Sequence, residues 1–178
     1  MPKPIPPERA ASDDAAKEAA LRMLARGPRT EREIADRLTE RGFLPDAVER
    51  AVERLRRVSL LDDRAFVRSF LRSELLRKPQ GRRLLEAKLR RRGVPAALLA
   101  AWERTLEEES DLAERSLETE AGRARAAADE ILRKLARRPP ADRRRRLEGA
   151  LLRRGFGWDT IRDLVEAHRE ELEPEDEE

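Results

Sequence analysis

The chain has 178 residues, enough for one domain or two small ones, and it has no cysteine, which excludes disulfides and thiolate metal sites. Charged residues make up 43% of the chain and aromatic residues only 3%, with a formal net charge of +3. No stretch approaches the roughly 18 consecutive apolar residues of a membrane span, and the N-terminus lacks the apolar core of a secretory signal. We therefore expect a cytoplasmic protein with no membrane partner.

The apolar residues recur at helical spacing and nowhere alternate as they would in a strand. This pattern predicts folded helices, although the charge content alone would be compatible with disorder. In "TEREIADRLTERGF" (30–43), Thr30 and Glu33 predict a capping box at the start of a helix. Gly42 predicts the left-handed residue that ends this helix.

The stretch "LLDDRAFVRSFLRSE" (60–74) has the features of a helix start. Asp62 suits the N-cap, and Asp63 suits the electropositive first turn. Leu61 and Phe66 have the spacing of a hydrophobic staple across that start. We interpret the two aspartates as capping residues rather than a catalytic carboxylate pair, because neither a base nor a nucleophile accompanies them.

Three glycines close helices of the same design: Gly42 in "DRLTERGF", Gly93 in "KLRRRGV" and Gly155 in "GALLRRGF". Each glycine has apolar residues four and eight positions before it and another directly after it. A further helix is expected before each of these segments, at about 13–26, 62–77 and 111–138. The repetition predicts an all-α protein, an elongated and curved α-solenoid of three tandem three-helix repeats.

The domain organisation follows from these repeats. We expect a flexible N-terminal segment, three helical repeats and an acidic tail, with bounds 1–12, 13–60, 61–109, 110–169 and 170–178. The expected first helix of the third repeat is long and rich in alanine and charge. This composition is compatible with a packing in the third repeat that differs from that of the first two.

Charge is strongly segregated along the chain. Residues 77–94 hold eight basic residues against one acidic residue, and residues 133–154 hold ten against two. Between them, residues 103–120 hold eight acidic residues against two basic ones, and residues 170–178 hold seven acidic residues and no basic one. We hypothesise that the acidic tail competes with DNA for the basic segments.

Two interpretations compete for the basic segments. Cations at helix C-termini complement the helix dipole and solvate an exposed face, which accounts for one or two arginines per helix. The larger number favours an electropositive strip that faces a polyanion or an acidic protein. The candidate binding residues are Arg77, Lys78, Arg82, Arg83, Lys88, Arg90, Arg91, Arg92, Arg143, Arg144, Arg145, Arg146, Arg153 and Arg154. The aromatic residues mostly occupy expected core or turn positions, which argues against base stacking on single strands.

Catalytic chemistry is absent from the sequence. It contains no glycine-rich phosphate loop, nucleophile elbow, HExxH motif or EF-hand loop. The single histidine, His168, is interpreted as a helix-surface residue, because transition-metal sites need several donors. We expect no catalytic, cofactor-binding or metal-binding residues, and therefore no enzyme.

The sequence from about 17 to 170 resembles the RecX family of bacterial recombinase regulators. The most specific parts of the resemblance are the "LLDDRAF" stretch and the G-R-R-x-[LI]-x-x-x-L-R-x-[KR]-G-[VI] pattern at 81–94. The resemblance implies an elongated helical protein that binds the RecA–DNA filament in its groove. It also implies inhibition of the ATPase, strand-exchange and co-protease functions of RecA.

This interpretation assigns a RecA filament and the phosphates of single- or double-stranded DNA as partners, and we expect a monomer. One alternative is a stand-alone basic helical protein that binds DNA architecturally, without an effect on RecA. A second alternative is a helical scaffold that recruits an acidic protein and does not bind DNA.

Overall fold

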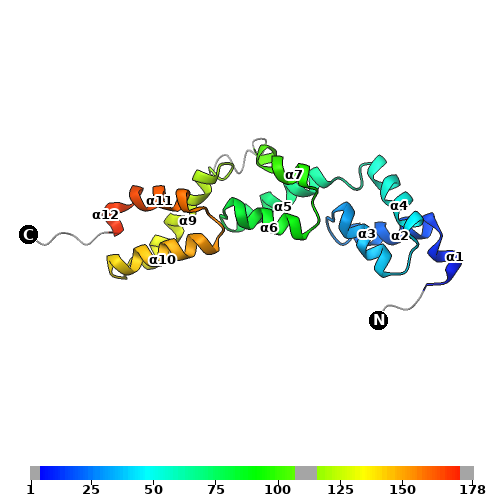
Figure 1. The fold of residues 1–178 in the computed structure, drawn as a ribbon, viewed down its shortest axis with the longest axis horizontal. Coiled ribbons are helices and arrows are strands. Elements are labelled where there is room, and N and C mark those ends of the chain that lie inside the picture. The colour runs from blue at the N-terminus through cyan, green and yellow to red at the C-terminus, as the bar shows by residue number, and fades with distance from the viewer. Residues whose placement is uncertain (1–4, 107–115, 173–178) are drawn as a thin grey trace, which may run out of the picture. The chain divides into compact units, whose positions relative to one another are not determined.

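The computed structural model describes residues 5–106 and 116–172, and every regular element in those ranges is a helix (Figure 1). The elements are α1 (Pro7–Ala10), α2 (Asp13–Leu24), α3 (Glu31–Glu40), α4 (Pro45–Arg57), α5 (Asp63–Arg77), α6 (Arg82–Arg91), α7 (Ala96–Ala101), the 3₁₀ helix η1 (Trp102–Leu106), α9 (Glu120–Leu135), α10 (Pro140–Arg153), α11 (Trp158–Ala167) and α12 (Arg169–Leu172).

These helices form three successive triplets: α2–α4, α5–α7 and α9–α11. The prediction of an all-α fold with three tandem three-helix repeats is therefore confirmed. The chain divides into two compact units, one formed by the described residues of 1–67 and 89–100 and the other by those of 68–88 and 101–178. Each unit contains one junction between consecutive repeats.

The first repeat is held by a core in which α2 supplies mainly small side chains and α3 and α4 supply larger ones. Ala16, Ala19 and Ala20 of α2 are buried, which lets this helix approach α4 closely. Thr30 and Glu33 form the capping box of α3: the Glu33 amide donates to Thr30 Oγ1 (3.1 Å), and the Thr30 amide donates to Glu33 Oε2 (3.2 Å). Local sequence thus fixes where α3 begins.

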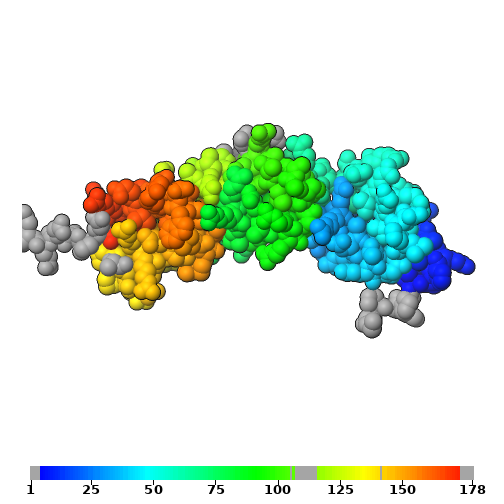
Figure 2. Space-filling view, in the orientation of Figure 1, coloured from blue at the N-terminus to red at the C-terminus, as the bar shows by residue number. Residues whose placement is uncertain are grey.

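The third repeat has its own core between α9, α10 and α11. Helices α10 and α11 pack against each other, and they form the yellow-to-orange and orange-to-red regions of Figure 2. Its first helix was expected at about 111–138, but α9 runs from Glu120 to Leu135. Thr119 caps it by accepting a hydrogen bond from the Gly122 amide (3.1 Å). Residues 111–115 of the expected helix lie outside the described residues.

Both ends of the described chain pack on a repeat. The segment 1–12 was expected to be flexible, but its described part contains α1, Ala10 is buried, and Ile5 packs on the core of the first repeat. The Leu44 amide donates to the Ala10 carbonyl (2.9 Å), which attaches this segment beside α4. At the other end, α12 buries Leu172, and residues 173–178 of the expected acidic tail lie outside the described residues.

The first junction joins the N-terminus of α3 to the second repeat. Asp63, the first residue of α5, accepts a hydrogen bond from the Glu31 amide (2.9 Å). Thr30 Oγ1 donates to the carbonyl of Arg92 (2.6 Å), directly before the left-handed Gly93. Two otherwise free polar groups at the start of α3 are therefore satisfied by the next repeat. Burial raises the pKa of the Asp63 carboxyl, although the Glu31 amide opposes that shift.

The second junction repeats this geometry at the N-terminus of α6. Glu120, the first residue of α9, accepts from the Arg82 amide (3.2 Å). The Gly81 amide donates to the Arg154 carbonyl (2.8 Å), directly before the left-handed Gly155. The N-terminus of the second helix of one repeat is thus capped twice by the next repeat, once by a carboxylate and once by a glycine turn.

Gly155→Ala tests how much the close approach at this turn contributes to stability. A Cβ at Gly155 would lie 2.5 Å from the Cβ and amide nitrogen of Leu84, and φ is +85°. We expect a loss of about 1–2 kcal/mol from the left-handed conformation and about 1–3 kcal/mol more from overpacking. Gly42→Ala is the matched control, because φ is +90° but the nearest atom, Ile5 Cγ1, lies 3.5 Å away. Equal losses in urea unfolding of the two variants would contradict the close packing at Gly155.

Candidate polyanion-binding surface

Several of the predicted binding cations instead form ion pairs and hydrogen bonds within the chain. Lys88 pairs with Glu74 and donates to Gln80 Oε1 (2.6 Å), so it ties α6 to the end of α5. Burial pushes the pKa of Glu74 upward, but the hydrogen bonds from Lys88 and Gln80 outweigh it and hold that pKa below its ordinary value. Arg77 pairs at the surface with the same Glu74 (3.3 Å). Lys88 therefore serves the fold of the second repeat.

The arginine before each junction glycine is also engaged. Arg92 makes a two-pronged contact with Glu33 of the capping box and stacks over the ring of Phe66 at 4.9 Å. Arg154 is buried and pairs with Glu130 of α9 at 3.0 Å. Hydrogen bonds from Lys134 and Arg154 lower the pKa of Glu130 to about 2. These two arginines are structural residues of the junction turns.

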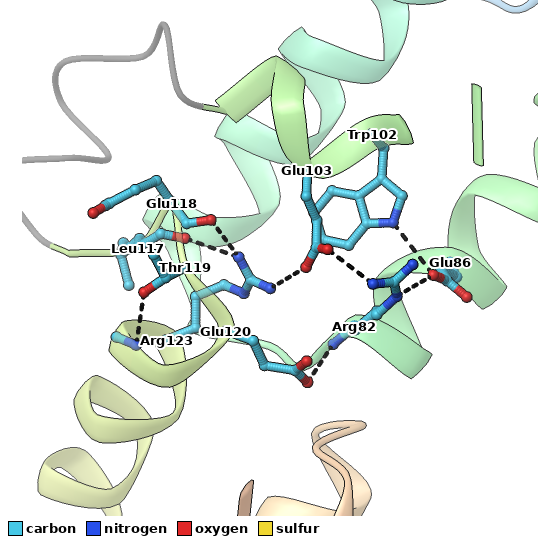
Figure 3. Close-up of polar contacts among 10 residues, drawn as sticks. Arg82, Glu86, Trp102, Glu103, Leu117, Glu118, Thr119, Glu120 and Arg123 are labelled. Atoms are coloured by element: carbon cyan, nitrogen blue, oxygen red, sulfur yellow. Dashed lines mark hydrogen bonds and ion pairs between the residues drawn. The ribbon is translucent and has the colours of Figure 1, made fainter. Parts of the chain in front are cut away.

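Arg82 belongs to a polar network in the second unit (Figure 3). Its guanidinium contacts Glu86 (2.6 Å) and Glu103 (2.9 Å), so it links α6 to η1. These carboxylates raise the pKa of Arg82, which keeps the guanidinium charged. An arginine with two carboxylate partners has little net charge to offer to a phosphate.

Arg123 lies at the centre of the same network, and sequence reasoning did not single it out. Its side chain is fully buried, and it donates to the carbonyls of Leu117 (3.2 Å) and Glu118 (3.0 Å) and to Glu103 Oε1 (3.3 Å) (Figure 3). The guanidinium also lies 5.4 Å from the ring centroid of Trp102. Burial lowers the pKa of Arg123, although Glu103 opposes this shift. Arg123 lies on the apolar, alanine-rich face of α9, and this position in the sequence pattern could have indicated that its side chain is buried.

The four consecutive arginines of α10 have different roles. Arg143 caps the end of α9 by donating to the carbonyls of Ala136 (2.7 Å) and Arg138 (2.6 Å), and it reaches the carbonyl of Glu171 (3.3 Å). Arg144 and Arg146 make exposed ion pairs one helical turn away, with Glu148 (3.3 Å) and Asp142 (3.9 Å). Arg145 is exposed and makes no such pair with any described residue.

Six of the predicted cations remain available, and we call them the free cations. Their side chains are exposed, and none makes an ion pair or side-chain hydrogen bond with the described residues. They are Lys78, Arg83, Arg90, Arg91, Arg145 and Arg153. Four of them recur at equivalent positions: Arg83 and Arg145 stand ten residues before their repeat's glycine, and Arg91 and Arg153 stand two residues before it. The second helices of two repeats thus present matching pairs of exposed guanidinium groups, which suit phosphate and carboxylate oxygens.

Within residues 5–106 and 116–172, no group of three or more His, Cys, Asp or Glu side chains is arranged to hold a metal ion. His168 Nδ1 donates to the Leu164 carbonyl (2.8 Å), and its Nε2 lies 3.6 Å from Asp129. None of the helices in the described part of the chain is long and apolar enough to cross a bilayer.

The fold and these contacts define an all-α protein built from three tandem three-helix domains. Models of the first, second and third three-helix domains of RecX match residues 16–55, 62–101 and 118–165, respectively. The chain belongs to the RecX family, whose curated members are named as regulatory proteins.

Individual relatives agree with this assignment. The "Regulatory protein RecX" of Mycobacterium sp. (strain KMS) is 35% identical over 153 residues, covering 82% of this chain and 76% of the relative. That of Chlorobaculum tepidum is 33% identical over 146 residues, covering 82% and 83%. The crystal structure of RecX from Lactobacillus salivarius has a TM-score of 0.70 at 19% identity, covering 87% of this chain and 95% of that chain, and so supports the fold.

Replacing Arg123 by Met tests the buried network. The change leaves the Leu117 and Glu118 carbonyls without their donor, and we expect a loss of about 2 kcal/mol in the free energy of unfolding. The loss of the Glu103 ion pair adds little, because Glu103 is partly exposed and still pairs with Arg82 in the variant. Arg125→Met, two residues further along α9 and exposed, is the matched control. Similar urea midpoints for the two variants would contradict a structural role for Arg123.

The low pKa of Glu130 predicts a pH-dependent contribution to stability. Because this pKa is about 2 in the folded protein and the ordinary value is 4.5, folding favours the ionised carboxylate. The stabilisation is fully present above about pH 4.5 and is lost as the pH falls towards 2. Glu130→Gln should therefore be less stable than the wild type at neutral pH and approach it in acid. Urea unfolding between these pH values measures the difference, and a constant difference would contradict the ion pairs.

Proposed function

We propose that this chain regulates RecA by binding the RecA–DNA filament in its groove, and that it mainly inhibits the recombinase, ATPase and co-protease activities. In this proposal it acts in the cytoplasm, without a cofactor and without catalysis. Membership of the RecX family supports a regulatory role, and the resemblance of the motifs supports RecA as the target.

The observation that carries the proposal is the matched pair of free cations on α6 and on α10. The structure uses many of its arginines for internal ion pairs, yet Arg83, Arg91, Arg145 and Arg153 are left exposed at equivalent positions. An exposed arginine without a carboxylate partner can form charge-assisted hydrogen bonds with a phosphate oxygen. Repetition of the pair on successive repeats suits a partner that is itself a charged polymer.

The proposed mechanism is obstruction. The exposed guanidinium groups dock the protein on DNA phosphates, and the helical repeats occupy space that a second DNA strand and moving RecA subunits require. The energy of docking is largely electrostatic, because contacts between cations and phosphates release condensed counterions. Inhibition should therefore weaken as the salt concentration rises.

A stand-alone DNA-binding protein is the second candidate, and the same free cations favour it. The two candidates differ in one observable. A stand-alone binder would associate tightly with bare DNA and leave the RecA ATPase unchanged, whereas the proposed regulator would lower the ATPase rate.

Changing the four paired free cations to Gln (R83Q, R91Q, R145Q and R153Q together) tests the proposal. We expect weaker inhibition of the RecA ATPase on single-stranded DNA. In binding to duplex DNA, the slope of log affinity against log salt should fall by about 0.9 for each arginine that neutralises a phosphate. Because none of these side chains has a partner among the described residues, unfolding by urea should change little.

The control is a second quadruple variant that removes the same charge from exposed arginines outside the second helices: Arg22, Arg26, Arg57 and Arg162. It should inhibit as the wild type does. Equal inhibition by both variants would contradict docking through α6 and α10. An unchanged ATPase rate with wild-type protein, together with tight binding to bare DNA, would favour the stand-alone binder.

A further inference from the structure

The three glycine turns have the same internal geometry. Each glycine has a positive φ: +90° at Gly42, +77° at Gly93 and +85° at Gly155. In each, the residue after the glycine is buried and its amide donates to the carbonyl five residues earlier, at 3.2 Å in all three turns. An arginine precedes every one of these glycines. The turns therefore present the same carbonyl groups and the same cationic side chain.

Two of the three turns are occupied by the N-terminus of a helix. The Arg92 carbonyl accepts from Thr30 at the start of α3, and the Arg154 carbonyl accepts from Gly81 at the start of α6. At the second of these turns, the Gly155 carbonyl also accepts from the Arg83 amide (3.2 Å). Docking a helix N-terminus is thus what this turn does wherever the chain supplies one.

The Gly42 turn is not occupied in this way. Arg41 and Gly42 are exposed, and no donor among the described residues meets either carbonyl. The Arg41 side chain makes no ion pair with any described residue, whereas the equivalent Arg92 pairs with Glu33 at the third position of the docked helix. Ile5 flanks the turn only at van der Waals distance, 3.5 Å from where a Cβ would be.

A second acceptor of the junction is also unused in the first repeat. Asp63 and Glu120, the first residues of α5 and α9, each accept an amide from a docked helix. Their counterpart is Asp13, the first residue of α2, which bonds Arg50 through Oδ2 (2.7 Å). Its other oxygen, Oδ1, is buried and has no hydrogen-bond partner among the described residues. An unsatisfied buried acceptor is uncommon and costs stability unless a donor reaches it.

We propose that the Gly42 turn is a docking site for the N-terminus of a helix in a partner protein. The partner helix offers backbone amides or a capping hydroxyl to the carbonyls of Arg41 and Gly42. It carries an acidic residue in its first turn, which pairs with the Arg41 guanidinium as Glu33 pairs with Arg92. The identity of this partner rests on the proposed function, which makes it a RecA protomer of the filament.

The second helix of the last repeat in a second copy of this chain does not fit the site. The position of α10 equivalent to Thr30 and Gly81 is Arg143, which already lies inside the helix because α10 begins a turn earlier, at Pro140. Pro139 and Pro140 at its start have no amide hydrogen to donate. The last repeat therefore lacks the donors with which the earlier repeats bind a glycine turn, and head-to-tail chains of this protein are not expected.

The experiment compares full-length wild type with Arg41→Glu in two binding assays, one with RecA filaments on single-stranded DNA and one with bare DNA. We expect Arg41→Glu to bind the filament about tenfold more weakly, because it replaces an ion pair by repulsion, and to bind bare DNA unchanged. Arg26→Glu makes the same change of charge at an exposed arginine of the same repeat and should bind the filament as the wild type does. Amide hydrogen exchange at residues 41–44 should slow when the wild type binds the filament.

Each other outcome has a definite meaning. Equal filament binding by Arg41→Glu and Arg26→Glu overturns the docking site and leaves the proposed function standing. An equal loss on bare DNA assigns Arg41 to phosphate contact and also overturns it. Self-association of the wild type in sedimentation, abolished by Arg41→Glu, would replace the partner by a second copy. If the wild type does not bind the filament at all, the proposed function and this inference fail together.

Discussion

The fold depends on how each repeat satisfies the amides at the start of a helix in the repeat before it. A helix begins with several N–H groups that have no partner inside the helix. In this protein the next repeat supplies two acceptors at the start of the second helix of the repeat before it. A carboxylate, Asp63 or Glu120, accepts a backbone amide, and the carbonyl of a glycine turn accepts the Thr30 hydroxyl at α3 and the Gly81 amide at α6. The requirement is electrostatic as well as geometric, because acceptors and negative charge are favoured at a helix N-terminus. Removing the next repeat would leave these donors unpaired.

The same requirement explains the glycines. A turn that ends one helix and also contacts the start of another needs a positive φ and no side chain at the point of contact. Gly155 meets both conditions against the backbone of Leu84, and Gly93 meets them against the flexible side chain of Arg32. Gly42 meets only the first, because its nearest neighbour, Ile5, lies at ordinary van der Waals distance from where a Cβ would be. The sequence pattern therefore marks three similar turns, while their energetic roles differ with their neighbours.

Local patterns predicted the helices, the capping box at Thr30 and Glu33, and the threefold repetition, because each depends on residues a few positions apart. Whether an individual arginine forms an internal ion pair or stays exposed depends on residues far away in the sequence, and therefore could not be predicted. Glu33 lies 59 residues from Arg92, and Glu103 lies 20 residues from Arg123. The basic run at 143–146 illustrates the difficulty: Arg143 caps a neighbouring helix, whereas Arg145 remains exposed. A run of like charges in sequence is thus not a single surface in the fold.

The arginines divide into a set that has partners within the fold and an exposed set that has none among the described residues. Buried or half-buried cations such as Arg123, Lys88 and Arg154 have carboxylate or carbonyl partners, which offset part of their desolvation. Exposed cations without partners add little to folding, because surface charges are well screened. In the proposed function these exposed cations are the binding groups, Arg83 and Arg91 in one repeat and Arg145 and Arg153 in the next. Because the two sets consist of different residues, the proposed binding can be changed through the exposed set while the junction contacts of Arg92 and Arg154 stay intact.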